Sequence, residues 1–369
     1  MKPQDCCVLI PSLSPDERLP AYVKDLLAAE FQLILVVDDG SKEEYQPIFE
    51  EIATWDRCQV LHHEVNRGKG AALRTGFAYI KEHTAIEGII TADSDGQHTV
   101  PDTLNLAAEM SEKEELLLGS RDFSKNSVQV PPKSRAGNRI TSCVFRVLYG
   151  RWLPDTQTGL RAFRRSLIDF MLGVTGDRFE YEMNQLIHCA VKKVPMRPLP
   201  IDTVYHDENK GTHFHPIRDS WRIYKLLLGN FFKFISASCV STVVDLLLFT
   251  LLGLVITFLP THASFLGTTL DMNTLLCAIV ARICSATVNF KLNQSFVFHL
   301  KKSSGAAGRY VILCGVVMIV SALSVSMLKT LLPFIHPTLI KGAVDLVLFF
   351  LNYRVQRVWV FPPENAVSA

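Results

Sequence analysis

Two carboxylates one residue apart, Asp93 and Asp95, are the residues whose type and spacing most clearly suggest chemistry. They follow the apolar run 88–92, which is typical of a buried strand. Gly96 permits the backbone turn that would bring both carboxylates to one side. Hard divalent cations prefer oxygen ligands, and Mg²⁺ or Mn²⁺ beside a phosphorylated substrate is typically held by one or two carboxylates. The run predicts a metal clamp on a diphosphate; its spacing alone also fits a solvated acidic turn.

Three further polar runs follow expected strands or open an expected helix. Run 38–41 (DDGS) suits a ligand site, but Ser41 with Glu44 also fits a capping box. Run 66–70 (NRGKG) is a glycine-flanked basic loop suited to phosphate at a helix N-terminus, and it lacks the full pattern of an ATPase phosphate loop. Run 119–122 (GSRD) supplies an arginine, whose fork can bind phosphate oxygens with two parallel hydrogen bonds.

The elements expected to position these runs alternate between strand and helix. Helices are expected over 16–30 and 68–81, and the expected strands are 6–12, 33–37, 58–63, 88–92 and 116–118. This alternation predicts a mostly parallel, doubly wound α/β sheet. Ligands of such sheets bind outside the carboxyl ends of the strands, where the acidic runs and Arg121 fall. The sequence therefore predicts one crevice shared by three loops.

Five motifs in this order carry a resemblance to a known family: VVDDGS, NRGKGAALRTGF, ADSDGQH, GSRDF and DTQTGLRAF. Together they resemble glycosyltransferase family 2, and within it most of all the dolichol- and polyprenyl-phosphate sugar synthases. The resemblance covers residues 6–215. It implies a Rossmann-like GT-A catalytic domain over residues 1–212 that binds a nucleotide sugar.

The resemblance also implies roles for individual residues. Asp93, Asp95 and Gln97 would hold Mg²⁺ or Mn²⁺ with the donor diphosphate. Arg121, Arg135 and Arg139 would engage the acceptor phosphate, and the catalytic candidates are Asp95, Arg121, Arg135 and Asp155. The candidates for donor binding are Pro11, Glu17, Asp39, Lys69, Asp93 and Ser94. Of these, Asp39 would contact the nucleobase or ribose, and Glu17 stands for the family's glutamate although Pro15-Asp16 replaces the usual asparagine.

Transfer to a lipid phosphate would not need a general base. The second pKa of a phosphate monoester is about 6, so the acceptor is already largely a dianion at neutral pH. It needs positioning and screening of charge, which a metal ion and arginines supply. The segment 133–151 interleaves basic and apolar residues and suits a helix on an anionic membrane surface, although an ordinary surface helix has the same pattern.

Two later segments match the family less fully. Asp155 of the DTQTG run could steer the acceptor, act as a base or hold Arg161 in a salt bridge; we favour the structural role. The helix expected over 180–193 begins with two glutamates that suit its dipole, so capping is as good an interpretation as catalysis. Residues 210–213 stand where the family often has R-x-x-G-x-S-K, without its arginine and terminal lysine.

The second half of the chain has the composition of a membrane domain. Residues 213–231 suit a basic interfacial helix, and four apolar stretches follow at 232–254, 272–292, 310–332 and 338–357. Each is close to the ~20 residues that a spanning helix needs. Basic residues flank the stretches on one side while the loop 255–271 has none, which predicts that both termini are cytoplasmic; Lys329 and Lys341 run against this rule.

The membrane half contains an internal repeat. Residues 289–298 (NFKLNQSFVF) recur as 352–361 (NYRVQRVWVF), which resembles the GtrA-like four-helix membrane domains and implies such a domain over 232–361. Asp245, Arg282 and Asp345 are the ionisable residues deep in the spans. Charges at matched depth usually pair, so we expect a structural Asp–Arg–Asp cluster rather than a transport site.

Composition excludes some classes of protein. A formal net charge of +2 gives no argument for nucleic acid as a partner. The nine cysteines show no metal spacing and are expected to be reduced. The N-terminal run MKPQDCCVLIPS lacks the apolar core of a signal peptide, so the first domain is expected in the cytoplasm.

These observations predict a multi-pass membrane enzyme that moves a sugar from a UDP- or GDP-sugar to polyprenyl or dolichyl phosphate, with inversion, at the cytoplasmic face. A processive polysaccharide synthase is a weaker hypothesis because the Q-x-x-R-W motif is absent. A lipid-linked sugar binding or flipping protein with a nucleotide-sensing domain is the alternative from another class. The sequence leaves open the sugar, the base, the lipid length and whether the chain forms a homo-oligomer.

Overall fold

The computed structural model describes residues 1–122, 132–202, 216–256, 263–265, 268–270, 272–298, 305–332 and 334–361. The chain divides into two compact units, Met1–Leu227 and Leu228–Ala369. Residues 210–213, noted above for their departure from the family motif, lie outside the described residues.

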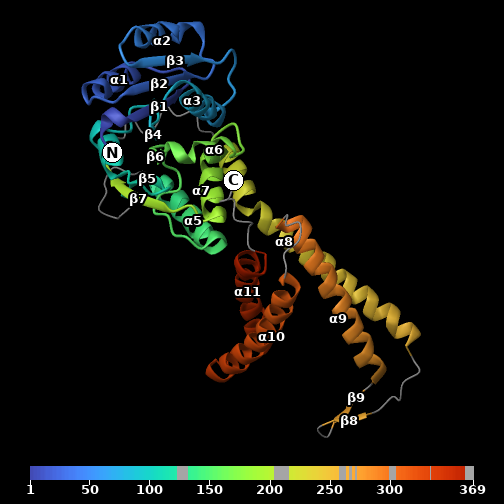
Figure 1. Ribbon diagram of the computed structural model, residues 1–369. Helices are drawn as coiled ribbons and strands as arrows, with labels where there is room; N and C mark the ends of the chain where they lie inside the picture. Colours follow the sequence, from blue (N-terminus) through green and yellow to red (C-terminus); the bar gives the residue numbers. More distant parts are fainter. Residues whose placement is uncertain are drawn as a thin grey trace. The chain divides into compact units, whose positions relative to one another are not determined.

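The first unit is built on one seven-stranded sheet of order β3-β2-β1-β4-β6-β5-β7 (Figure 1). Only β6 runs antiparallel to its neighbours, between β4 and β5. The strands are β1 (Cys6–Ser12), β2 (Leu33–Asp38), β3 (Cys58–His62), β4 (Gly88–Thr91), β5 (Leu116–Arg121), β6 (Arg161–Arg164) and β7 (Met196–Ile201). The mostly parallel α/β sheet is therefore confirmed, and it gains two strands that the sequence pattern did not predict.

Those two strands are hard to recognise in sequence for physical reasons. β6 has four residues, which is too short to display an alternating pattern. β7 contains Pro198 and Pro200, which cannot donate to a ladder and are confined to edge strands. The structure places β7 at the edge of the sheet, paired only with β5.

Helices cover both faces of the sheet, so its central strand β1 is buried on both sides. All seven residues of β1 are buried. Successive side chains of a strand point to opposite faces. Val8 and Ile10 pack with residues of α1, α2 and α4, whereas Leu9 packs against Gly76 of α3. The helices of this unit are α1 (Arg18–Ala28), α2 (Gln46–Ala53), α3 (Lys69–His83), α4 (Val100–Glu109), α5 (Pro132–Tyr149), α6 (Ile168–Leu172) and α7 (Glu180–Lys192).

The second unit is helical. Its long helices are α8 (Pro216–Val255, which begins in the first unit), α9 (Met272–Leu292), α10 (Ala306–Leu331) and α11 (Pro337–Val355). The short strands β8 (Ala263–Phe265) and β9 (Thr268–Leu270) form an antiparallel pair. The interfacial helix and the first span, expected as separate elements, form the single helix α8.

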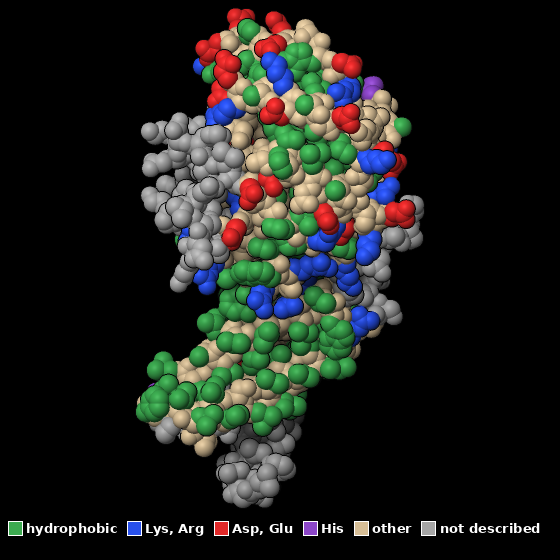
Figure 2. Space-filling model, turned by 90° about the vertical axis from the view of Figure 1, so that its left-hand side faces the viewer, with side chains coloured by type: hydrophobic (Ala, Val, Ile, Leu, Met, Phe, Trp, Pro, Cys, Tyr) green, Lys and Arg blue, Asp and Glu red, His purple; other side chains and the backbone are tan. Residues whose placement is uncertain are grey.

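The surface of these helices is apolar. Among the described residues, Leu227–Val255 is long and apolar enough to cross a membrane, and Ala306–Ser321 is a shorter apolar helix. Leu254, Val311 and Met318 are 75%, 69% and 69% exposed. Hydrophobic side chains crowd the outside of this unit in Figure 2. Continuous exposed apolar surface of this kind suits a lipid environment.

The repeated motif forms matching structures at the ends of α9 and α11. Each helix passes into a π-helical turn, Asn293–Val297 after α9 and Gln356–Val360 after α11. Asn293 Nδ2 donates to Gln356 Oε1 at 3.0 Å and also to Asn289, and Gln356 Nε2 donates to Asn352 Oδ1 at 3.3 Å. Four amides from the two repeats thus form one network, with Asn293 0% and Gln356 2% exposed.

The expected Asp–Arg–Asp cluster is confirmed for one pair and wrong for the third residue. Arg282 lies 3.3 Å from Asp245, which also accepts from the Ser285 hydroxyl at 2.8 Å. Asp345 instead pairs with Lys341, one helical turn away, and accepts from Ser321 Oγ, both at 2.8 Å. A lysine on the same helix face satisfies this carboxylate locally.

Candidate active site

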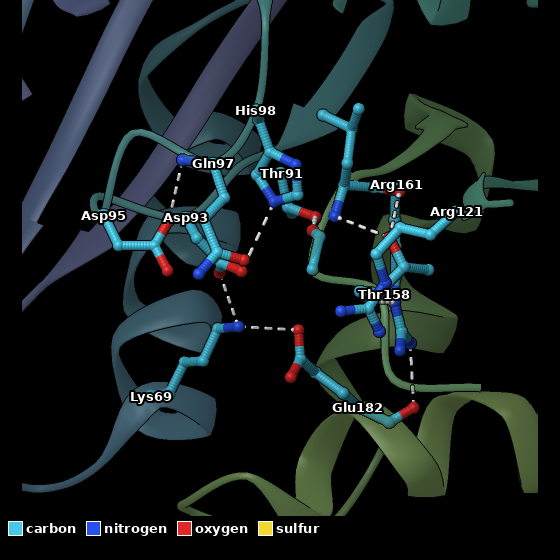
Figure 3. A network of polar contacts seen from close by, with 12 residues as sticks. Lys69, Thr91, Asp93, Asp95, Gln97, His98, Arg121, Thr158, Arg161 and Glu182 are labelled. Atoms are coloured by element: carbon cyan, nitrogen blue, oxygen red, sulfur yellow. Dashed lines mark hydrogen bonds and ion pairs between the residues drawn. The ribbon is translucent and has the colours of Figure 1, made fainter. Parts of the chain in front are cut away.

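The candidate site lies at the carboxyl ends of β2, β4 and β5, where the polar runs leave the sheet. Parallel strands end at the same edge, and antiparallel β6 adds the loop 155–160 that precedes it. The register pairs Thr91 of β4 and Leu118 of β5 with Arg161 of β6. This pairing brings the DTQTG loop beside both the acidic turn and Arg121, as Figure 3 shows.

The acidic turn has the predicted geometry. Gly96 has a φ of +75°, and Asp95 Oδ1 accepts from the Gln97 backbone N–H at 3.0 Å. Asp93 accepts from Lys69 Nζ at 2.6 Å and from His98 Nε2 at 3.3 Å. Burial opposes ionisation of Asp93, but the charges of Lys69 and His98 outweigh it and lower its pKa. Burial and the neighbouring Asp93 charge raise the pKa of Asp95.

The acidic turn offers carboxylate oxygens to a divalent cation. Asp93 and Asp95 supply hard oxygen donors close enough to perturb one another. No cluster of three or more His, Cys, Asp or Glu suited to a metal ion occurs among the described residues. Two carboxylates fit Mg²⁺ or Mn²⁺ when the rest of the coordination shell comes from water and a substrate diphosphate.

Asp39 is buried and bonded to groups of its own chain. Its carboxylate accepts from the backbone N–H groups of Arg67 at 2.9 Å and Gly68 at 2.7 Å, and from His63 Nδ1 at 2.8 Å. The side chain is 5% exposed. Asp39 therefore fixes the loop that ends at Lys69, and its expected contact with the nucleobase or ribose stays a prediction.

Arg121 is held by Asp155. Arg121 Nε and Nη2 donate to the two carboxylate oxygens at 2.6 and 3.0 Å, and the Asp155 side chain is fully buried. The structural role of Asp155 is thus observed, but the expected partner Arg161 was wrong. Asp155 opens the loop that leads into β6, the strand paired with β5, so the arginine at the end of β5 lies beside it.

Arg161 is buried among carbonyl groups. Its guanidinium donates to the Thr158 carbonyl at 3.0 Å, to the Glu182 carbonyl at 2.8 Å and to Gln185 Oε1 at 2.7 Å. It is 1% exposed. Arg161 therefore ties the DTQTG loop to the first turn of α7.

The other two arginines lie on α5, where Arg139 is exposed and Arg135 is partly buried. Asn138 between them donates to the Pro154 carbonyl at 2.6 Å and accepts from the Thr156 N–H at 3.0 Å. This contact fixes α5 against the DTQTG loop. Engagement of phosphate by Arg135 and Arg139 stays a prediction.

The remaining donor-site candidates lie on β1, just before α1 and in the acidic turn. Pro11 is buried in β1, opposite Val37 of β2. Glu17 is exposed just before α1, and a Cβ added to Gly96 would lie 3.2 Å from the Arg18 side chain. Ser94 is partly buried within the turn itself. Their roles in binding the donor stay predictions.

Sequence reasoning missed two residues of the site. Glu182 was interpreted as a helix cap or a catalytic residue, but not as a partner of Lys69, yet its Oε1 lies 2.9 Å from Lys69 Nζ. A Cβ added to Gly159 would lie 2.4 Å from Asp93 Oδ2, so this glycine makes room for the acidic turn. The glycine in DTQTG carried a signal; Glu182 carried none, because its partner lies on a distant helix.

Comparison with protein families agrees with this geometry. Residues 7–171 match the model of glycosyl transferase family 2, and residues 233–361 match the GtrA/DPMS transmembrane domain. The chain is therefore a glycosyltransferase whose family 2 domain is joined to a GtrA/DPMS membrane domain. The predicted resemblance, the fold class and the class of enzyme are confirmed.

Curated relatives match the catalytic half. A UDP-N-acetylglucosamine–dolichyl-phosphate N-acetylglucosaminyltransferase of Methanococcus voltae is 27% identical over 56% of this chain and 89% of its own length. Polyprenol monophosphomannose synthase of Mycolicibacterium smegmatis is 30% identical over 45% of this chain and 64% of its own. Glycosyltransferase AglJ of Haloferax volcanii is 25% identical over 60% of this chain and 70% of its own length.

A solved structure similar to this chain is Mycobacterium tuberculosis glucosyl-3-phosphoglycerate synthase. It is 17% identical, covers 61% of this chain and 79% of its own, and has a TM-score of 0.39.

Proposed function

We propose that this protein transfers a sugar from a nucleotide-sugar donor to polyprenyl or dolichyl phosphate at the cytoplasmic membrane face. The observation that carries the proposal is the convergence of Asp93, Asp95 and Arg121 on one sheet edge, in a chain that continues into a membrane domain. The named acceptors of the relatives, dolichyl phosphate and polyprenol phosphate, support the lipid acceptor.

The reaction is a single displacement. An oxygen of the acceptor phosphate attacks the anomeric carbon, the bond from that carbon to the donor diphosphate breaks, and the nucleoside diphosphate leaves with inversion. A divalent cation held by Asp93 and Asp95 would neutralise charge on the leaving diphosphate.

The protein's own residues orient the two anions. Asp155 holds the Arg121 guanidinium in one plane, which suits recognition of phosphate oxygens in a fixed geometry. Asp155 itself is fully buried with both oxygens engaged, so it is poorly placed to act as a base. A phosphate dianion needs none.

Transfer of label tests the proposal. The full-length protein is incubated with a radiolabelled UDP- or GDP-sugar, a short polyprenyl phosphate and Mg²⁺ or Mn²⁺. We expect label in the organic phase with one nucleoside diphosphate released per sugar, and none with Asp95→Asn or after exhaustive chelation.

Two results would contradict the proposal. Binding of the nucleotide sugar with no lipid product would favour the alternative of a binding or flipping protein. Full turnover by Asp95→Asn would remove the role assigned to the acidic turn.

A further inference from the structure

Lys69 lies between two carboxylates from different elements. Its ammonium is 2.6 Å from Asp93 Oδ1, on the turn after β4, and 2.9 Å from Glu182 Oε1, on the first turn of α7 (Figure 3). The side chains of Lys69, Asp93 and Glu182 are 17%, 28% and 12% exposed. Burial disfavours the ammonium, but the two carboxylates outweigh it and raise the pKa of Lys69. The lysine is therefore a resident cation on a residue assigned to the metal.

Neighbouring groups fix the main chain under Glu182 and confine Asp93. Arg161 donates to the Glu182 carbonyl at 2.8 Å and fixes the start of α7. Asp93 packs against Gly159, which has no space for a Cβ on that side. Lys69 is the first residue of α3, and its four-carbon side chain is the flexible member of the three. The ammonium can change partner while the carboxylates stay.

A divalent cation and the Lys69 ammonium cannot share Asp93 at low cost, because like charges repel strongly in a partly buried site. Glu182 offers the ammonium a second anionic partner within hydrogen-bond distance of its present position. The pair of Asp93 and Lys69 would otherwise hold the cation site closed.

We propose that Lys69 and Glu182 set the affinity of the donor site for its divalent cation: Lys69 occupies Asp93 in the empty enzyme and stays on Glu182 alone when the cation binds. This inference rests on the proposed function, since it takes Asp93 and Asp95 as the cation's ligands. It assigns to Glu182 a positioning role that acts through Lys69.

The inference predicts effects of opposite sign for two neighbouring residues. Lys69→Met removes the competitor and should tighten Mn²⁺ binding by about tenfold. Glu182→Gln leaves the ammonium with Asp93 alone and should weaken Mn²⁺ binding by several-fold to about tenfold. In the double variant Glu182→Gln should add little to Lys69→Met, because its effect passes through the lysine.

Mn²⁺ binding is measured on the purified full-length protein without nucleotide, by water-proton relaxation, so turnover is not the readout. Thermal unfolding of each apo variant shows whether it is folded. The matched control is the pair of Lys81 and Asp169, which joins α3 to α6 with Nζ–Oδ1 at 2.5 Å. Lys81→Met and Asp169→Asn should leave Mn²⁺ affinity unchanged.

Three results would overturn the inference. The first is that Lys69→Met binds Mn²⁺ no more tightly than the wild type, or that neither protein binds Mn²⁺ at all. The second is that Glu182→Gln weakens Mn²⁺ binding equally with and without Lys69. Glu182 would then act on the cation through its own charge and not through the lysine. The control pair could shift affinity as much as the test pair. Sugar transfer by the wild type is scored separately, so these results would leave the proposed function standing.

Discussion

Gly159 lies so close to Asp93 that no side chain fits at this position. Its carbonyl accepts from Thr91 Oγ1 at 2.8 Å, and an added Cβ would lie 2.4 to 2.6 Å from three atoms of the Asp93 carboxyl group. The antiparallel pairing of β6 with β4 brings the two segments this close. The position of Asp93 therefore depends on a glycine in another loop.

Gly159→Ala should displace Asp93 and lower sugar transfer by about two orders of magnitude, since small misplacements of a reacting geometry are costly. The measurement is turnover with labelled donor, alongside thermal unfolding. Gly137→Ala on α5, where nothing lies within 4 Å of an added Cβ, is the control and should retain wild-type turnover. Equal turnover in both variants would show that this contact does not position Asp93.

For the ion pair of Arg121 with Asp155, the sequence predicted the type of partner but not the particular residue. The sequence indicated that Asp155 would hold an arginine, and it does. The expected partner was Arg161 rather than Arg121, because the sequence does not show which strand end lies beside the loop. Arg161 turns instead toward carbonyl groups of Thr158 and Glu182.

At the scale of elements, α8 is continuous where two helices were expected. The segment crosses from a basic amphipathic composition to an apolar one without a proline after Pro216. Gly229 lies near the change, and its ideal Cβ would meet nothing within 4 Å. A change of hydrophobicity marks where a helix meets a new solvent, but it does not break the backbone hydrogen bonds.

The amide network at the ends of α9 and α11 makes a stability prediction. Asn293→Leu removes the donor to buried Gln356, so unfolding should become easier by about 2 kcal/mol. Asn293→Leu with Gln356→Leu should recover part of that loss, because no buried amide is then left facing an apolar partner. Thermal unfolding in detergent measures both variants.

Thr287→Val is the control for this network, since Thr287 is exposed on α9 and donates to Ile283 of its own helix. It should unfold like the wild type. A double variant whose loss of stability equals the sum of the losses in Asn293→Leu and Gln356→Leu would show that the two amides do not act as a pair.

At the scale of the whole molecule, the membrane arrangement is the feature to test. The positive-inside rule predicts that the segment between α8 and α9 lies on the non-cytoplasmic side of the membrane. It predicts that the segment between α9 and α10 lies on the cytoplasmic side, where the catalytic domain is expected. The experiment uses a variant of the protein whose reactive native cysteines have been replaced, expressed in intact cells. In this background an impermeant maleimide should label the single-cysteine variant Thr261→Cys and spare the variant Ser303→Cys. The reverse labelling would contradict a cytoplasmic site.

The sequence alone determined the chemistry and the broad architecture. Motif order, strand periodicity and apolar length are local properties, and they were sufficient for the α/β catalytic domain, the acidic turn, Arg121 and the helical membrane domain. The repeat at 289–298 and 352–361 is likewise visible in the sequence.

The contacts between side chains that are distant in the sequence were known only from the folded structure. Glu182 with Lys69, Asp155 with Arg121, Gly159 with Asp93 and Asp345 with Lys341 and Ser321 depend on register and on the insertion of antiparallel β6. Long-range pairing is fixed by packing of whole elements rather than by spacing along the chain. Residue types therefore predicted which functional groups gather at this site, and the fold determined how those groups pair with one another.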